Sequence, residues 1–257
     1  SDLLEYSVVF TDRSVNHMSG RFQACMNQLH AGLTETYNAP SMVLVPGGGS
    51  YAMEAVARQF GMGKRKTFLR NGWFSYRWTQ IFDAIEPGYQ APIMMAQRIG
   101  HSASDAANTP FQPRPLDQVL EHIETYKPEV FFAPHVETSA GMVLPDDYIS
   151  AVGAAVRANG GLFVLDCVAS GALWVDMQAL NVDVLVTAPQ KGWSSSPSAG
   201  VVLLGERALA RMDEIKPTSF TVDLAKWHAI MQAYLGGGHA YHATMPTDAL
   251  LGFAENM

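Results

Sequence analysis

Residues 182–200 read VDVLVTAPQKGWSSSPSAG. The first half is a continuous run of apolar, mostly β-branched side chains, which is typical of a strand buried on both faces. Lys191 follows where such a strand ends, among Gln190, Gly192, Trp193 and three serines. Desolvation lowers the pKa of a lysine from about 10.4, so this position favours a neutral amine that can attack a carbonyl. The alternative is a strand-end lysine that reaches solvent, and this stretch alone does not decide.

The composition is that of a globular protein. Among 257 residues, 48% are hydrophobic and 16% are charged, a length and balance that suit one large α/β domain or two small ones. The net charge is −7 and no basic stripe is present, so nucleic acid is not an expected partner. Cys25 and Cys167 lack metal-type spacing, which favours a reducing compartment. With no signal pattern and no apolar run of about 18 residues, we expect a cytoplasmic protein.

Helical and strand-like segments alternate along the chain. Apolar periodicity predicts helices at 21–37, 51–60, around 76–85, 116–126, 146–158, near 207 and at 224–234. Short apolar runs predict strands at 42–45, 67–70, 93–96, 130–133, 162–165, from 182 and at 201–204, whereas the proline-containing stretch 101–115 is predicted to be a loop. The pattern predicts an α/β fold, with a mostly parallel sheet and helices on both faces. Binding sites in such sheets lie at the carboxyl ends of the strands.

A glycine turn follows the first strand. Residues 46–49 read PGGG and lead into a predicted helix, so backbone N–H groups at the helix start favour an anion such as phosphate. A tight turn without a ligand is an equally open interpretation. Gly47, Gly49 and Ala52 fit a loose dinucleotide fingerprint, but residues 70–71 are Arg-Asn where a ribose-binding acid is required. A nicotinamide dinucleotide is therefore disfavoured.

Asp166 ends the predicted strand of residues 161–166, GLFVLD. A buried carboxylate is seldom without a partner, and a cofactor with a protonated ring nitrogen would supply one; an Asp that caps the next turn is the simpler alternative. Lys191 lies one crossover connection further along the chain. A strand-end Asp, a strand-end Lys and an anion-binding glycine turn together indicate a site for pyridoxal 5′-phosphate.

Six short motifs extend this pattern over nearly the whole chain. They are PGGGSYAMEA at 46–55, NGWFSYR at 71–77, HVETSAG at 135–141, LDCVASGA at 165–172, APQKGW at 188–193 and YHATMP at 241–246. In this order they resemble the class V aminotransferases of fold type I, and most closely the alanine/serine–glyoxylate (serine–pyruvate) aminotransferase group. The resemblance implies a transferase, the fold type I large domain and a pyridoxal phosphate cofactor.

The resemblance also implies individual roles. The cofactor phosphate would be held by Gly48, Gly49, Ser50 and Gln190.

The remaining roles concern the cofactor ring. Phe74 would stack on it, with the adjacent Trp73 as a possible substitute. Val168 would pack beneath it, and Ser139 would hydrogen-bond the cofactor. The catalytic residues would be Asp166, paired with the ring nitrogen, and Lys191, as Schiff-base lysine and proton carrier.

Three segments follow from the resemblance. Residues 1–40 are expected to form an N-terminal arm and helix with an intersubunit role, 41–235 the cofactor-binding large domain, and 236–257 an interface loop and the start of a helix that leads to a C-terminal domain. That domain, with the arginine that binds the substrate carboxylate, is absent from this sequence, so we expect a fragment. Family members are homodimers, and Tyr241 and Thr244 match the pair that reaches the neighbouring subunit's phosphate.

The main functional hypothesis is transfer of the amino group of alanine or serine to glyoxylate or pyruvate. A cysteine desulfurase or lyase of the same superfamily is the alternative, although neither Cys25 nor Cys167 occupies a suitable loop. A non-catalytic or dinucleotide-binding α/β protein is the further alternative. His239 and His242 have no acidic or Cys partner nearby in the sequence, so no metal is expected.

Overall fold

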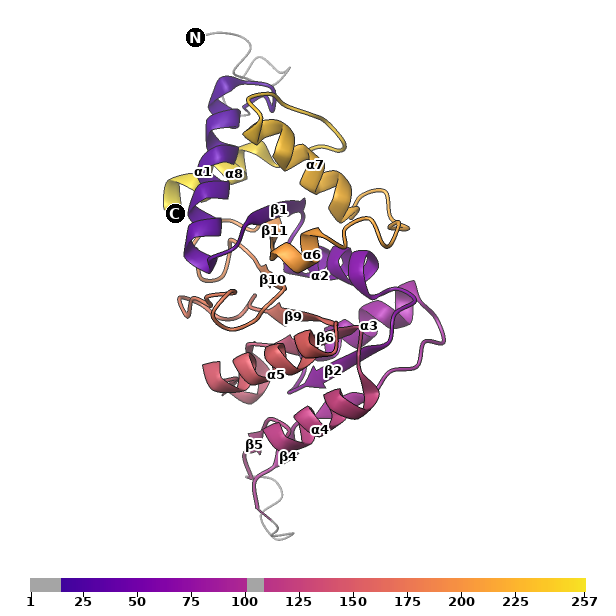
Figure 1. The fold of residues 1–257 in the computed structure, drawn as a ribbon. Helices are drawn as coiled ribbons and strands as arrows, with labels where there is room; N and C mark the ends of the chain where they lie inside the picture. Colours follow the sequence, from indigo (N-terminus) through magenta and orange to yellow (C-terminus); the bar gives the residue numbers. More distant parts are fainter. Residues whose placement is uncertain (1–14, 101–108) are drawn as a thin grey trace.

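The computed structural model describes residues 15–100 and 109–257. Within them, a central seven-stranded sheet has the order β1-β11-β10-β9-β6-β2-β3 (Figure 1). The arm predicted for the first residues lies mostly outside the described part. The strands are β1 (Ser41–Pro46), β2 (Lys66–Arg70), β3 (Ile93–Met95), β6 (Val130–Pro134), β9 (Leu162–Asp166), β10 (Val184–Thr187) and β11 (Ala199–Leu204).

Most of the sheet is parallel, as predicted. The strands β10, β9, β6, β2 and β3 pair in parallel, whereas β11 is antiparallel to both β10 and β1. Residues 188–198, between β10 and β11, contain no helix, and a parallel pair needs a longer crossover, so β11 turns back along β10. The carboxyl ends of β1, β2, β6, β9 and β10 consequently lie at one edge of the sheet.

The predicted helices are present, three of them with the predicted bounds. They are α1 (Gly20–Tyr37), α2 (Gly49–Val56), α3 (Tyr76–Ile85), α4 (Leu116–Tyr126), α5 (Asp146–Ala158), α6 (Glu206–Leu209) and α7 (Leu224–Leu235), and α8 (Thr247–Asn256) follows near the chain end. The helix predicted at 51–60 begins earlier because Gly48 is its extended N-cap, and it ends in a π-helical turn, Ala57–Gly61.

Part of the stretch predicted to be a loop is a short hairpin. Strands β4 (Gln97–Arg98) and β5 (Phe111–Gln112) pair antiparallel on either side of residues 101–108, which lie outside the described part. Side-chain alternation is not visible in strands of two residues, so periodicity could not reveal them.

Helices α1, α7 and α8 gather at the β1 end of the sheet (Figure 1). Ser19 caps α1 by accepting a hydrogen bond from the Phe22 N–H, and the predicted apolar face of α1 is buried within its own chain. Gln28 Nε2 donates to the Ala254 carbonyl at 2.8 Å, which ties α1 to α8. An intersubunit role for α1 stays a prediction. None of the described helices is long and apolar enough to cross a membrane.

Asp183, directly before β10, connects three elements of the fold. Its carboxylate is buried and accepts hydrogen bonds from the Phe163 N–H at 2.9 Å and from Arg207 Nη1 at 2.8 Å. A second arginine, Arg157, lies 3.5 Å away. This network links β9 to α6 and to the start of β10.

We expect Asp183→Ala to lower the free energy of unfolding by about 3 kcal/mol, because a buried carboxylate is lost while Arg207 and the Phe163 N–H are left without their acceptor. Urea denaturation measures this change. Asp213→Ala removes an exposed carboxylate and serves as the control, with an expected change within about 0.5 kcal/mol. Equal effects of the two substitutions would contradict the network's importance.

Candidate active site

The segments predicted at strand ends come together around one cavity. It has a volume of about 230 Å³ and opens at the carboxyl ends of β1, β9 and β10. Seven of the eleven residues implied by the resemblance line it. The lining consists of Gly49, Ser50, Met53, Phe74, Arg77, Val136, Thr138, Asp166, Val168, Ala169, Gln190 and Lys191.

The glycine turn forms one wall of the cavity. Gly47 has a φ of +127°, a conformation that side chains disfavour, and Gly48 caps α2 without a side-chain hydrogen bond. A Cβ on Gly49 would lie 2.8 Å from Val168 Cγ2, so only glycine lets α2 approach this closely. The first N–H groups of α2 therefore face the cavity region, where the helix dipole favours an anion.

Arg77 adds a cation to this wall. It comes from the first turn of α3, and its Nη1 donates to Ser50 Oγ at 2.9 Å. The resemblance assigned it no role, so sequence reasoning missed it. Its only sequence signal is its spacing from Phe74, because residues three apart at a helix start share a face.

Asp166 lies at the end of β9 with 8% of its surface exposed. Burial raises its pKa to about 6; the Val168 N–H, which donates to Asp166 Oδ1 at 3.0 Å, and then Arg77 partly oppose this rise. A buried carboxylate of this kind is stabilised by a cationic partner.

Lys191 lines the same cavity, but its side chain is exposed. The expectation that it is desolvated is therefore wrong for this chain alone. Lys191 lies in the turn after β10, two residues beyond the buried Pro189, where the backbone has already left the sheet.

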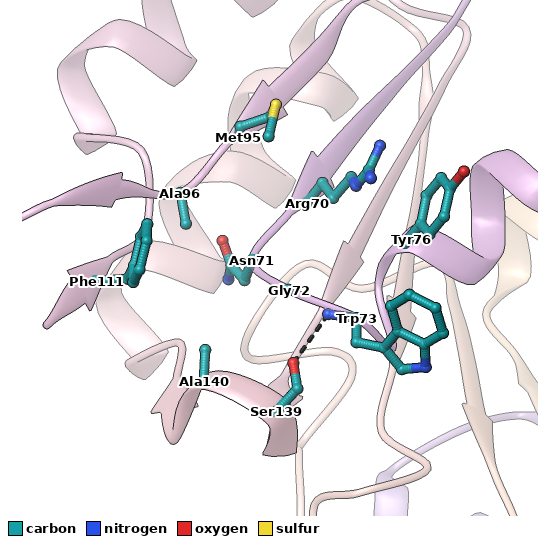
Figure 2. Close-up of a pocket in the computed structure, with 10 residues that line it drawn as sticks. All are labelled: Arg70, Asn71, Gly72, Trp73, Tyr76, Met95, Ala96, Phe111, Ser139 and Ala140. Atoms are coloured by element: carbon teal, nitrogen blue, oxygen red, sulfur yellow. Dashed lines mark hydrogen bonds between the residues drawn. The ribbon is translucent and has the colours of Figure 1, made fainter. Parts of the chain in front are cut away.

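The structure shows which of two neighbouring aromatic residues, and which of two neighbouring hydroxyl residues, lines the cavity. Phe74 lines this cavity, whereas the adjacent Trp73 lines a neighbouring one, which favours Phe74 for the predicted stacking role. Thr138 lines this cavity, but Ser139 does not. The Ser139 hydroxyl donates to Glu137 Oε1 at 2.6 Å and accepts from the Trp73 N–H at 2.8 Å (Figure 2). The hydrogen bond from Ser139 to the cofactor therefore stays a prediction, while Thr138 is the hydroxyl-bearing residue of this turn that lines the cavity.

Glu137 holds these two loops together. It ends β7 (Val136–Glu137), immediately before a 3₁₀ turn (Thr138–Ala140), and is fully buried. Its carboxylate accepts from the N–H groups of Phe74 at 3.1 Å and Ser75 at 2.9 Å, and from the hydroxyls of Ser75 at 2.7 Å and Ser139. Burial raises the pKa of Glu137, but these hydrogen bonds lower it by a larger amount, so the pKa lies below its ordinary value. The charged form is thus favoured.

Four implied residues lie outside the cavity lining. Gly48 adjoins it, because a Cβ there would be 3.9 Å from Gln190 Nε2, and Ser139 faces away as described. Tyr241 and Thr244 are exposed, with their hydroxyls 3.5 Å apart. No group of three or more metal-type side chains occurs in residues 15–100 and 109–257.

Comparison with known proteins assigns the chain to a family. A family model described as aminotransferase class-V matches residues 3–257. The chain belongs to the class-V aminotransferases. The resemblance predicted from the six motifs is confirmed, and so is the dependence of this family on pyridoxal 5′-phosphate.

Curated relatives share much of this chain. A 2-aminoethylphosphonate–pyruvate transaminase of Salmonella paratyphi B is 28% identical over 238 residues, which cover 90% of this chain and 59% of the relative. An alanine–glyoxylate aminotransferase of Rattus norvegicus is 24% identical over 251 residues, covering 95% of this chain and 56% of the relative. The chain thus spans less than two thirds of the length of these class-V relatives.

Solved structures show the same fold. An alanine–glyoxylate aminotransferase from Nostoc sp. has a TM-score of 0.75 and 23% identity, with 93% of this chain and 60% of that chain covered. A ureidoglycine–glyoxylate aminotransferase from Bacillus subtilis has a TM-score of 0.73 and 21% identity, with 93% and 59% covered. The predicted α/β fold of type I, with a parallel sheet between helices, is confirmed.

The cavity fits pyridoxal phosphate by its donor set. The start of α2 and Arg77 suit a phosphate, the buried Asp166 suits a protonated ring nitrogen, and Phe74 and Val168 supply apolar surface. The amine of Lys191 borders the same space.

Glu137→Gln tests the link between the loops. We expect a loss of about 2 kcal/mol in unfolding free energy at pH 7, because an amide cannot accept all these hydrogen bonds. The pKa of Glu137 lies below its ordinary 4.5, so the contribution of the carboxylate is present above pH 4.5 and is lost as the pH falls through the lowered pKa. Urea denaturation across pH 3–7 should show the two proteins converging in acid, whereas the exposed Glu124→Gln should change little; a constant gap would contradict a role for the charge.

Asp166→Asn tests the cost of the buried carboxylate. In the cofactor-free protein, the raised pKa means that stability falls as the pH rises from 3.8 through about 6, whereas the Asn variant lacks this fall. The difference between these values corresponds to about 3 kcal/mol, so the variant should be the more stable protein at pH 8 by an amount of that order. Parallel pH profiles of the two proteins in urea denaturation would contradict the assignment.

Proposed function

We propose that the protein is a pyridoxal phosphate-dependent aminotransferase that moves the amino group of a small amino acid, such as alanine or serine, to pyruvate or glyoxylate. The observation that carries this proposal is the convergence of Lys191, Asp166 and the start of α2 on one cavity. Membership of the class-V family and the names of the relatives support it.

Bound pyridoxal phosphate supplies an aldehyde that condenses with amines and a ring that withdraws electrons from the bonds of the α-carbon. The chain's own residues bind and orient it. The N–H groups at the start of α2 would donate to phosphate oxygens, and Arg77 would add a positive charge beside them. Asp166 would be ionised opposite a protonated ring nitrogen, while Phe74 and Val168 would limit the motion of the ring.

Lys191 is the proton carrier in this proposal. With the cofactor bound, its Nζ would accept the proton that leaves the substrate α-carbon and would later release it, so the amine would act first as a base and then as an acid. The exposed position of Lys191 leaves the side chain room to move between these two points. Thr138 borders the same cavity, and we assign to it the cofactor hydrogen bond that the sequence placed on Ser139.

A desulfurase reaction is less well supported by the cysteines. Cys25 and Cys167 are both buried, and burial raises the pKa of Cys25 to about 12 and that of Cys167 further still. A buried neutral thiol is a poor nucleophile. Neither residue therefore supplies the mobile thiolate that sulfur transfer needs.

We further propose that the working enzyme is a homodimer. Tyr241 has 65% of its surface exposed and, with Thr244, lies outside the lining of its own chain's cavity. Hydroxyls so exposed are free to reach the phosphate of a second copy, which the family resemblance implies.

Lys191→Ala tests the proposed activity in the full-length protein. We expect loss of the cofactor's visible absorption change on adding amino acid, and a fall in turnover of at least about 10²- to 10⁴-fold, because the proton carrier is removed. Alanine, serine and 2-aminoethylphosphonate are compared as donors, with pyruvate and glyoxylate as acceptors. Lys226→Ala, an exposed lysine on α7, is the control. Unchanged turnover in Lys191→Ala would overturn the proposal.

A further inference from the structure

A second cavity lies on the other side of the loops that border the cofactor cavity. Its volume is about 390 Å³, larger than that of its neighbour, and it occupies the carboxyl ends of β2 and β3 (Figure 2). The function proposed above makes no use of it. It is lined by Arg70, Asn71, Gly72, Trp73, Tyr76, Met95, Ala96, Phe111, Ser139 and Ala140.

Arg70 places a positive charge in this cavity. Its guanidinium carbon lies 3.7 Å from the centre of the Tyr76 ring, a cation–π contact that restrains the side chain. Within residues 15–100 and 109–257, no Asp or Glu forms an ion pair with Arg70. A stacked arginine with its N–H groups available is suited to a carboxylate.

Asn71 provides a second polar group. The residue is 4% exposed, and its Oδ1 is buried with no hydrogen-bond partner in the described part of the chain. Figure 2 shows its side chain inside the cavity, with the oxygen on the side of Ala96. A buried acceptor without a donor is uncommon in folded proteins, so a ligand that donates an O–H or N–H is the natural complement.

Three large apolar side chains of the lining are exposed. Trp73, Met95 and Phe111 are 65%, 52% and 45% exposed, although large apolar side chains are normally covered. Figure 2 shows Met95 and Phe111 on the side of Asn71 and Ala96, and Trp73 beside Tyr76. A flat apolar group against Met95 and Phe111 would bury their surface.

We propose that this cavity is a second binding site, which takes a small carboxylic acid with a hydroxyl or amino group on carbon 2 and an aromatic side chain. Arg70 binds the carboxylate, Asn71 Oδ1 accepts from the hydroxyl or amino group, and the ring packs against Met95 and Phe111. Each of the three chemical features of the ligand satisfies one feature of the cavity.

The site adjoins the cofactor cavity through shared loops. Trp73 and Ser139 line the second cavity, while their neighbours Phe74 and Thr138 line the first. The Trp73 N–H donates to the Ser139 hydroxyl, which in turn donates to Glu137. A ligand that contacts Trp73 would therefore affect the position of the loops that carry Phe74 and Thr138.

L-3-Phenyllactate is the probe, because a hydroxy acid has no amine that could condense with the cofactor. Calorimetric titration of the holoenzyme at up to about 10 mM should detect binding with a dissociation constant of about 1 mM or below. Arg70→Gln should weaken binding by about tenfold or more, since a charged hydrogen-bond donor is lost. Ala96→Phe should block the cavity, while Arg65→Gln, a change at an exposed arginine elsewhere, should have no effect.

Paired ligands test the site without any mutation. Phenylpropionate lacks the hydroxyl and 2-phenylethanol lacks the carboxylate, so both should bind several-fold more weakly than phenyllactate. This comparison holds even where a variant fails to fold.

Results of three kinds would overturn the proposal. The first is no heat from phenyllactate at about 10 mM in the wild type. The second is equal binding in wild type, Arg70→Gln and Ala96→Phe, or a loss of binding in Arg77→Gln, which would place the ligand in the cofactor cavity. The third is a changed oligomeric mass of Ala96→Phe in light scattering, which would make the cavity a contact between copies of the chain.

Discussion

The buried carboxylate of Glu137 is the interaction on which the rest of the site depends. It collects backbone and hydroxyl donors from the Phe74–Ser75 segment and from Ser139, so the loops after β2 and β6 form one unit. Hydrogen bonds to a charged acceptor are strong, and burial strengthens them further. Gly72 completes the unit, since a Cβ there would lie 2.8 Å from Glu137 Cδ. Phe74 and Thr138 of this unit line the first cavity, and Trp73 and Ser139 line the second.

In the described part of the chain by itself, the first cavity contains a buried carboxylate and backbone N–H groups that lack partners of opposite charge. Asp166 is a buried carboxylate whose pKa is raised, and the start of α2 presents N–H groups without a side-chain cap. A ligand that carries both a cationic ring nitrogen and a phosphate would relieve both costs. Binding of such a ligand and stability of the fold are therefore linked, because a ligand held only by the folded state shifts the folding equilibrium toward that state.

Regular elements were largely predictable. The bounds of α3, α4 and α5 agree with those expected from apolar periodicity, because each of these helices has one buried face and one exposed face. The hairpin of β4 and β5 was missed because its strands are too short to show a pattern. The motifs also indicated the cofactor and predicted a cofactor hydrogen bond from Ser139, whereas Thr138 is the residue of this turn that lines the cavity. In a tight 3₁₀ turn, neighbouring side chains point in different directions, and linear spacing does not show which one faces the cavity.

The sequence by itself determined the mostly parallel α/β sheet, the position of Asp166 at a strand end and of Lys191 in the turn after a strand, and membership of the class-V family. These follow from local periodicity and from short motifs, which are properties of neighbouring residues. Only the tertiary structure decided that Arg77 joins the wall formed by the glycine turn, that Lys191 is exposed, and that Arg70 and Asn71 line a separate cavity. Burial and contact across loops arise from residues far apart in the chain, so they become visible only when the sheet has brought those residues together.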